Sequence, residues 1–154
     1  MDPDNIRRVV EQYSDLLLHI ALTRTDSAAD AEDVVQDAFL KLLTCGPRFR
    51  DEAHEKAWLI RTTLNLSYDL RRSASRRNVP LEEAADTETE TVPPLLSAVR
   101  SLPDKYGAII HLHYYEGYTI REISKLLRLP AATVGTRLAR GRERLKQLLE
   151  EEYL

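Results

Sequence analysis

Apolar residues recur every three or four positions in the first two segments of the chain, which is the spacing of one helical face. The first segment carries Ile6, Val9, Val10, Tyr13, Leu16, Leu17 and Ile20. The second carries Val34, Val35, Ala38, Phe39, Leu42 and Leu43. We therefore predict two amphipathic helices. Asp26 or Ser27 can cap the second helix, and the Cys-Gly-Pro sequence at residues 45–47 should end it.

The same reasoning predicts a third helix over residues 55–72, with a basic C-terminal end, after a loop at residues 45–54. Four further helices are expected at residues 95–102, 104–115, 119–128 and 130–150. Thr119 and Glu122 have the spacing of a capping box, and Pro130 suits a first helical turn. The sequence holds no convincing strand pattern and no internal repeat. We expect an all-α protein.

Residues 78–94 differ from the rest of the chain in composition. They contain no basic residue, five acidic residues and three prolines. A charged run of this kind is usually a solvated, flexible linker. It divides the chain into two small helical domains, residues 1–77 and residues 95–154, and a chain of 154 residues leaves each of them only a modest core.

The net charge of −3 conceals an uneven distribution of charge. Residues 61–79 carry five basic and one acidic side chains, and residues 120–146 carry eight basic and two acidic ones. By contrast, residues 1–60 carry seven basic and twelve acidic side chains. Two separated basic blocks on an acidic protein indicate two contacts with a polyanion such as a nucleic acid.

Residues 119–128 and 130–150 have the spacing of a helix-turn-helix, whose second helix can lie in the major groove of DNA. Its buried side would hold Ile120, Ile123, Leu127, Leu129, Val134 and Leu138. The second helix presents Thr133, Thr136, Arg137 and Arg140 first, and then Arg142, Arg144 and Lys146. An arginine can pair with both acceptors of guanine, whereas the later basic residues suit phosphates. A basic helix in a plain bundle is the structural alternative.

Two further segments carry polar side chains in informative patterns. Asp33, Gln36 and Asp37 lie within about one helical turn of one another, so they form either a solvated face or a docking site for a basic protein surface. Residues 57–72 interleave aromatic rings with an asparagine and arginines. In single-stranded DNA, rings stack on bases, amides read base edges and arginines hold phosphates. The alternative is that the rings of Trp58 and Tyr68 belong to the core, and for Trp58 the core interpretation is the preferred one.

In this order the three segments resemble the bacterial alternative sigma factors of the extracytoplasmic-function group, a branch of the sigma-70 family. The segment DAEDVVQDAFLKL is similar to the region that docks on the clamp helices of core RNA polymerase. The segment AWLIRTTLN and the DLRR after it resemble the part that opens and reads the −10 promoter element. Residues 102–145 resemble the helix-turn-helix that reads the −35 element.

This resemblance implies roles for particular residues. Those expected to dock on the polymerase are Asp33, Gln36 and Asp37. Those expected at the −10 element are Arg61, Asn65, Arg71 and Arg72. Arg137 and Arg140 match the arginines of the recognition helix, within a −35 set of Thr133, Thr136, Arg137, Arg140, Arg142 and Arg144. The loop at residues 45–54 corresponds to the segment that captures a flipped −10 base. Gly135 stands where Lys or Arg is usual, which removes one candidate DNA contact.

The function implied by the resemblance is that of an alternative sigma factor. Such a protein binds core RNA polymerase, directs it to promoter DNA and helps to melt that DNA, in the cytoplasm and without a catalytic residue, cofactor or metal of its own. Many members are held inactive by an anti-sigma factor, so a partner of that kind is expected. The acidic linker would thread the basic polymerase channel in which RNA normally lies.

Composition argues against several other classes of protein. The longest nearly apolar stretch, residues 16–22, is far below the about 20 residues that a membrane span needs, and we expect no signal peptide. The single cysteine excludes an internal disulfide. His111 and His113 should face different directions, which disfavours a zinc site, and no Gly-rich phosphate loop is present. The open alternatives are a helix-turn-helix regulator whose residues 1–77 form an effector or dimerisation domain, and a pure interaction module.

Overall fold

The chain folds into helices throughout the part that the structure, a computed structural model, describes: residues 2–77 and 92–153. The elements are α1 (Pro3–Arg24), α2 (Ala28–Cys45), α3 (Glu52–Arg77), α5 (Pro94–Ser101), α6 (Asp104–Ile110), η1 (His111–Tyr115), α7 (Ile120–Leu127) and α8 (Ala131–Tyr153). No strand occurs in these two ranges, in agreement with the all-α prediction. Most of the predicted linker at residues 78–94 lies outside the described residues.

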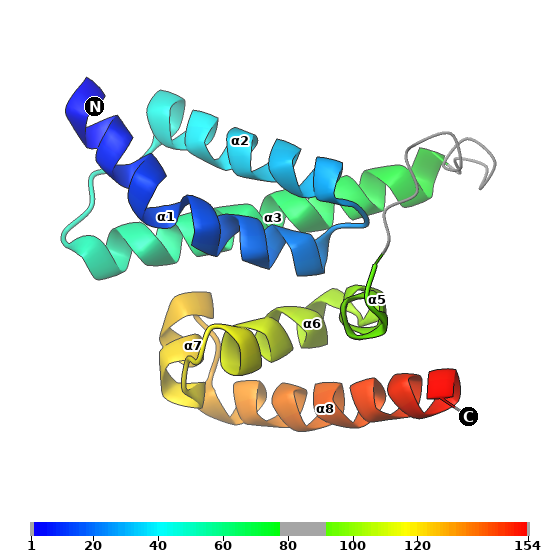
Figure 1. Ribbon diagram of the computed structural model, residues 1–154. Helices are drawn as coiled ribbons and strands as arrows, with labels where there is room; N and C mark the ends of the chain where they lie inside the picture. The colour runs from blue at the N-terminus through cyan, green and yellow to red at the C-terminus, as the bar shows by residue number, and fades with distance from the viewer. Residues whose placement is uncertain (1, 78–91, 154) are drawn as a thin grey trace.

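Helices α1, α2 and α3 form the first half of the molecule (Figure 1). The hydroxyl of Ser27 accepts the N–H of Asp30 at 3.1 Å, which confirms Ser27 as the cap of α2. Helix α2 ends at Cys45, where Gly46 is the capping residue. Helix α3 is longer than predicted at both ends. It begins early because the carboxylate of Asp51 accepts the N–H of His54 at 2.8 Å, and no helix-breaking residue stands between 72 and 77.

The second half begins with α5 and α6, followed by the five-residue element η1 (Figure 1). The prediction of one α-helix over residues 104–115 is wrong at its end, because His111–Tyr115 is a π-helical turn. The N–H of Glu116 bonds to the carbonyl of His111 at 3.1 Å, five residues back, and that of Tyr118 bonds to Leu112 at 3.0 Å. This wider turn ends the helix before the helix-turn-helix.

The capping box predicted at the start of the helix-turn-helix is present. The hydroxyl of Thr119 accepts the N–H of Glu122, and the carboxylate of Glu122 accepts the N–H of Thr119, both at 3.1 Å. Helix α7 stops at Leu127 because Arg128 adopts the left-handed conformation, with φ of 56°. Pro130 lies just before α8 rather than in its first turn, and its carbonyl accepts the N–H of Val134 at 3.1 Å.

The two halves pack against each other along α1 and α3. Figure 1 shows α5, α6 and α7 lying beneath the first three helices, and α1 contacts α5 and α6 while α3 contacts α7. One cluster of buried apolar side chains therefore runs through both halves, joining Leu17 and Leu59 to Ile109 and Ile123. A second, smaller cluster lies between α1 and α2. Sequence periodicity predicts the inner faces of the helices, but it does not show that the two halves share a core.

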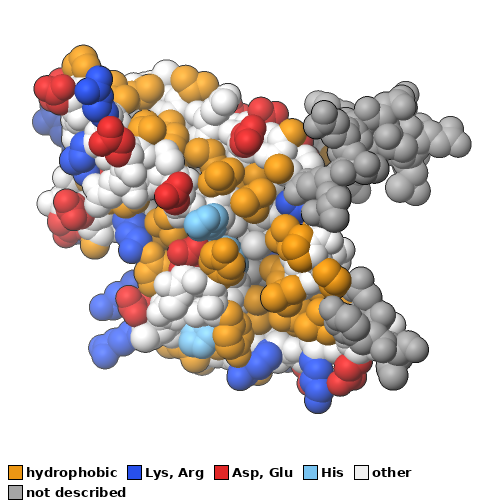
Figure 2. Space-filling view, in the orientation of Figure 1, with side chains coloured by type: hydrophobic (Ala, Val, Ile, Leu, Met, Phe, Trp, Pro, Cys, Tyr) orange, Lys and Arg blue, Asp and Glu red, His pale blue; other side chains and the backbone are white. Residues whose placement is uncertain are grey.

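The described helices include none that combines the length and the hydrophobicity required to cross a membrane. On the face shown in Figure 2, hydrophobic side chains gather along the junction of the two halves, and Lys and Arg side chains stand at the outer edges. Among the side chains that the structure describes, the large apolar ones that are exposed are Val10, Leu40, Leu43, Leu95, Tyr114 and Tyr115. Val10 and Leu43, which the periodicity places in the core, are therefore on the surface.

Candidate nucleic-acid interfaces and docking surface

Helix α8 carries the predicted −35 residues, and four of them share one surface. Thr133, Thr136, Arg137 and Arg140 line an open pocket of about 390 Å³. Thr136 and Arg140 are exposed, whereas Thr133 and Arg137 are partly buried. The spacing of three and four residues explains this arrangement, because such positions lie on the same side of a helix. Two hydroxyls and two guanidinium groups therefore lie on one side of α8, and those of Thr136 and Arg140 are the exposed ones.

Helix α6 adds residues to this surface that sequence reasoning missed. Lys105 and Tyr106 complete the lining of the pocket formed by α8. The guanidinium carbon of Arg144 lies 5.1 Å from the centre of the Tyr106 ring, and that of Arg142 lies 6.0 Å from the Tyr114 ring. Both arginines are exposed, and the rings limit their positions. In the sequence, the only sign that α6 contributes to this surface is a basic residue next to a tyrosine at positions 105–106.

The predicted −10 residues lie along α3. Arg61 and Asn65 are four residues apart, and Tyr68, which is outside the predicted −10 set, follows three residues later. We call these three side chains the −10 face. They line a cavity of about 480 Å³ together with Lys105 and Arg137 of the second half. The structure thus brings Asn65 and Arg137, predicted for different promoter elements, to the same cavity.

Two members of the −10 face have shifted titration behaviour. Burial lowers the pKa of Arg61, and the nearby positive charge of Arg128 lowers it further. The guanidinium of Arg61 donates to the carbonyl of Leu126 at 2.8 Å. Burial raises the pKa of Tyr68 to about 12, so this phenol is neutral at physiological pH. Asn65 between them is exposed.

The two arginines at the predicted basic end of the −10 region differ in environment. Arg72 is exposed and pairs with Asp69 at 3.2 Å. Arg71 instead points toward the second half, where it forms an ion pair with Asp104 at 3.3 Å, and it also pairs with Asp26 of the first half at 3.4 Å. It also donates to the carbonyl of Arg100 at 2.6 Å. In this arrangement Arg71 is a bridge between the halves of the molecule.

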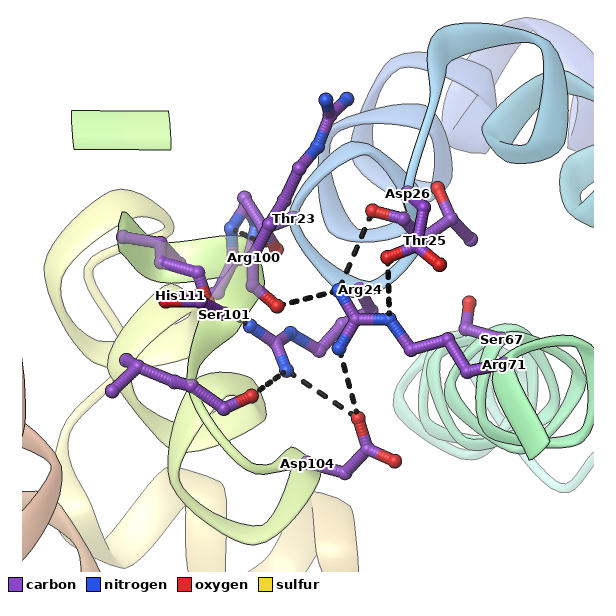
Figure 3. A network of polar contacts seen from close by, with 12 residues as sticks. Thr23, Arg24, Thr25, Asp26, Ser67, Arg71, Arg100, Ser101, Asp104 and His111 are labelled. Atoms are coloured by element: carbon purple, nitrogen blue, oxygen red, sulfur yellow. Dashed lines mark hydrogen bonds and ion pairs between the residues drawn. The ribbon is translucent and has the colours of Figure 1, made fainter. Parts of the chain in front are cut away.

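Arg24, at the end of α1, is the central residue of that bridge and was not predicted from the sequence. Figure 3 shows Arg24 and Arg71 converging on the carboxylate of Asp104, at 3.5 and 3.3 Å. Arg24 is fully buried and also donates to the carbonyls of Val99 and Leu102. Burial lowers the pKa of Arg24 to about 10, with a smaller contribution from Arg71, so it remains a cation at physiological pH.

The predicted polymerase-docking residues lie on α2 beside a groove. Asp33, Gln36 and Asp37 are exposed and line a groove of about 530 Å³. Its opposite wall comes from α3, with Leu66, Asp69 and Leu70. The groove therefore combines apolar surface with carboxylates, which is suited to an amphipathic basic helix. The contribution of α3 could not be predicted, because the pairing of these two helices is a tertiary contact.

The loop at residues 45–54 is shorter than predicted, since α3 begins at Glu52. The ring of Phe49 meets Trp58 edge-on at 5.9 Å and His54 at 5.2 Å. Trp58 is partly buried and packs against the core, which agrees with the prediction that its ring is a core residue. The aromatic contacts hold the loop over the start of α3.

The histidines in positions 111 and 113 have different partners. His111 is buried between Thr23, at 3.1 Å from its Nδ1, and Glu116, at 3.0 Å from its Nε2. His113 contacts the carbonyl of Tyr118 at 2.8 Å through its Nδ1. Among the residues with described positions, no group of three His, Cys, Asp or Glu side chains is arranged to hold a metal ion.

Both halves match known protein families. Residues 9–77 match the family model for sigma-70 region 2, and residues 94–145 match that for sigma-70 region 4. The chain is 28% identical to the ECF RNA polymerase sigma factor SigW of Bacillus subtilis, covering 97% of this chain and 91% of that protein. It is 30% identical to SigL of Mycobacterium tuberculosis, covering 95% and 89%. It is 32% identical to SigM of the same species, covering 86% and 71%.

Solved structures show the same fold. CnrH, in complex with the cytosolic domain of CnrY, has a TM-score of 0.73 at 26% identity, over 97% of this chain and 90% of that one. The sigma factor RpoE of Bartonella quintana, in complex with the anti-sigma factor NepR, has a TM-score of 0.74 at 20% identity, over 95% and 97%. The chain therefore belongs to the extracytoplasmic-function group of the sigma-70 family.

Proposed function

We propose that this chain is an alternative sigma factor in which residues 1–77 dock on core RNA polymerase and open the −10 element, while residues 95–154 read the −35 element. The predicted linker, residues 78–94, joins these two domains. The observation that carries the proposal is the presence, on one chain, of an exposed basic recognition helix, a polar −10 face and an acidic docking groove. The polymerase performs the chemistry, and this chain supplies specificity.

Promoter recognition by α8 rests on Arg137 and Arg140. Their side chains lie on the same surface as Thr133 and Thr136, in the first turns of the second helix of the helix-turn-helix. A bidentate pair between an arginine and a guanine provides about 1–3 kcal/mol of discrimination. Arg142 and Arg144 are suited to phosphate contacts, which add affinity that falls with salt concentration.

Melting at the −10 element uses binding energy. Flipping a base out of the duplex costs a few kcal/mol, so the protein must hold the unpaired strand better than the duplex does. On α3, the amide of Asn65 can read a base edge, the ring of Tyr68 can stack and Arg61 can hold a phosphate. Arg72 adds positive charge at the C-terminal side. The loop at residues 45–54 is the proposed site for the flipped base.

Docking on the polymerase is assigned to Asp33, Gln36 and Asp37. The carboxylates attract a basic surface, and the apolar wall of the groove, from Leu66 and Leu70, gives the contact a hydrophobic part. Helices of the core enzyme's clamp are the proposed partner. We also propose a cytoplasmic location, where the proposed polymerase partner acts. An anti-sigma factor is the proposed regulator, in line with the structurally similar sigma factor RpoE, which forms a complex with the anti-sigma factor NepR.

Run-off transcription with purified core polymerase and genomic DNA tests this function. Productive initiation at defined start sites only when the chain is added is the expected result. A helix-turn-helix regulator of another class would instead bind its operator alone and give no initiation with core enzyme. Absence of transcripts under conditions where another sigma factor supports them would contradict the proposal.

A further inference from the structure

We infer that Lys105, Tyr106 and Arg144 form a phosphate-binding site for duplex DNA, in which the ring of Tyr106 holds the two cations beside the predicted −35 residues of α8. We call this group of three side chains the phosphate site. The inference rests on the proposed function, because that function places promoter DNA on α8. It adds a cation from a second helix, α6, and a tyrosine that positions the two charges.

Tyr106 brings together two cations that are far apart in the sequence. The ammonium of Lys105 lies 5.0 Å from the centre of the Tyr106 ring, and the guanidinium carbon of Arg144 lies 5.1 Å from the same centre. Both distances are in the range of a cation–π contact, in which the negative face of the ring attracts a positive charge. The ring is buried, whereas Lys105 and Arg144 are exposed. A ring that the core fixes therefore carries two charges at the surface.

Close packing between α6 and α8 brings the ring to this position. The two helices lie against each other (Figure 1). Gly141 of α8 is buried at this contact, and a Cβ at position 141 would lie 3.2 Å from the Cβ of Tyr106 and 3.0 Å from Cγ1 of Ile110. The absence of a side chain at Gly141 thus allows α8 to approach Tyr106. Arg144 follows Gly141 by three residues, so it reaches the ring from the next turn of the same helical face.

The two charges of the phosphate site have no anionic partner in the part of the chain that the structure describes. No described Asp or Glu forms an ion pair with Lys105 or Arg144. Because each charge is about 5 Å from the same ring centre, the two cations lie within about 10 Å of each other, a separation at which like charges still repel. An anion bound beside both of them would offset this repulsion. By contrast, Arg24 and Arg71 share the carboxylate of Asp104.

The titration of Tyr106 agrees with an environment that favours negative charge. Burial raises the pKa of the Tyr106 phenol, but Lys105, followed by Arg144 and Arg140, lowers it by more, so that this pKa lies below its usual value. Cations that stabilise a phenolate at this position would also stabilise the oxygen of a phosphate.

The surroundings of the phosphate site indicate which polyanion it binds. Lys105 and Tyr106 line the same pocket as Thr136 and Arg140, which are proposed to meet base edges, and no Asp or Glu belongs to the described lining of this pocket. A helix in the major groove has the phosphates of both strands along its sides, and contacts with them fix its position on the duplex. A cation on α6, next to the recognition helix, is suited to such a phosphate. Duplex DNA is therefore the ligand that continues this surface.

The experiment measures how DNA binding by the full-length chain depends on salt. The probe is an end-labelled pool of short duplexes of randomised sequence, so that phosphate contacts are measured without knowledge of the promoter. Fluorescence anisotropy gives the affinity between about 50 and 200 mM KCl. Each phosphate contact contributes about 0.9 to the slope of log affinity against log salt concentration, and about eightfold to the affinity at about 0.1 M salt. Circular dichroism verifies folding.

Lys105→Gln removes the charge that α6 contributes. We expect the slope to become smaller by about 0.9 and the affinity at about 0.1 M salt to fall about eightfold. Lys105→Arg retains the charge and should behave as wild type. The matched control is Arg7→Gln, which removes the same charge from an exposed position of α1 and should leave the slope unchanged. An unchanged slope in Lys105→Gln, or an equal loss in Arg7→Gln, overturns the inference.

A double-mutant cycle tests whether Tyr106 positions Arg144. Arg144→Gln should weaken binding about eightfold in the wild-type background but less than about twofold in Tyr106→Leu, because an arginine that the ring no longer holds has already lost its contact. Tyr106→Phe keeps the aromatic face, so the full effect of Arg144→Gln should return there. A merely structural role of Tyr106 leaves the effect of Arg144→Gln equal in all three backgrounds, which overturns the positioning role. Lys105→Gln changes an exposed position and decides the inference even if Tyr106→Leu does not fold.

Failure of the proposed function gives a different result from failure of this inference. Absence of run-off transcripts with core polymerase contradicts the function, whatever the salt slopes are. Normal transcripts together with an unchanged slope in Lys105→Gln overturn the phosphate site alone. Weaker binding of Lys105→Gln to core polymerase, with its DNA slope unchanged, also overturns the phosphate site, in favour of an acidic protein surface as the partner of Lys105.

Discussion

The guanidinium of Arg24 occupies the space that a side chain at position 107 would need, so the absence of a side chain at Gly107 allows a buried cation to join the two halves of the molecule. The carbonyls of Val99 and Leu102 and the carboxylate of Asp104 accept hydrogen bonds from this guanidinium. The buried charge of Arg24 is tolerated because these acceptors replace the hydrogen bonds that water would otherwise make to the guanidinium.

Replacement of Arg24 by alanine should therefore destabilise the fold. Arg24→Ala leaves the carbonyls of Val99 and Leu102 without this donor and leaves the carboxylate of Asp104 with Arg71 alone. We expect the free energy of unfolding to fall by about 3 kcal/mol. Urea denaturation followed by circular dichroism measures the change. Arg7→Ala, on an exposed position of the same helix, is the control and should change it by less than about 0.5 kcal/mol. Equal stability of the two variants would contradict the assigned role of Arg24.

Loss of the recognition-helix arginines should change promoter choice without affecting polymerase binding. For Arg137→Ala or Arg140→Ala we expect initiation at −35-dependent promoters to fall about tenfold or more, since each bidentate pair with guanine contributes about 1–3 kcal/mol. Run-off transcription gives the promoter profile, and co-purification with core enzyme gives binding. Arg121→Ala removes an exposed charge on α7 and is the control. An unchanged promoter profile would refute the assignment.

Charge reversal in the docking groove should weaken association with core polymerase. Asp33→Lys combined with Asp37→Lys replaces attraction to a basic helix by repulsion, and an affinity loss of at least about tenfold is expected. The matched control is Glu11→Lys with Asp15→Lys, exposed positions four residues apart on α1. Pull-down titration with core enzyme measures the effect. Normal binding of the groove variant, or equal loss in the control, would remove the docking assignment.

Asn65 should affect melting more than binding to duplex DNA. For Asn65→Ala we expect open-complex formation to fall about tenfold, the loss of one hydrogen bond to an unpaired base. Permanganate reactivity of the −10 region measures melting, and a template with a pre-melted −10 bubble should restore much of the activity. If the pre-melted template is not better used than the duplex, the side chain has another role.

Acid should destabilise the second half through His111. Burial, more than any other effect, lowers the pKa of His111, and the nearby charges of Arg24 and His19 add to this while Glu116 opposes it. The pKa of His111 is therefore lower in the folded protein than in the unfolded chain, where it is near 6.5. As the pH falls below about 6.5, protonation of His111 favours the unfolded chain, so the free energy of unfolding should fall. Urea denaturation between about pH 7 and pH 5 should show a smaller pH dependence in His111→Asn than in wild type. Parallel curves would contradict this prediction.

Local features of this protein were accessible from its sequence because they depend on neighbouring residues. The cap of α2 and the capping box of Thr119 and Glu122 are contacts over three residues. Spacing is sufficient to predict the capping box, and it narrows the cap of α2 to Asp26 or Ser27, of which the structure shows Ser27. The same is true of the surface that Arg137 and Arg140 share on α8, which one helical period determines. The family resemblance followed from the order of such local segments.

Tertiary structure alone decided which side chains meet across the two halves. In sequence, Arg71 is one of two similar arginines at a basic helix end, yet it pairs with Asp104 while Arg72 stays exposed. Arg24 has the sequence context of the polar end of an amphipathic helix, and its burial depends on Gly107, far away in the chain. Contacts at such separations depend on the relative placement of whole helices, which sequence periodicity does not specify.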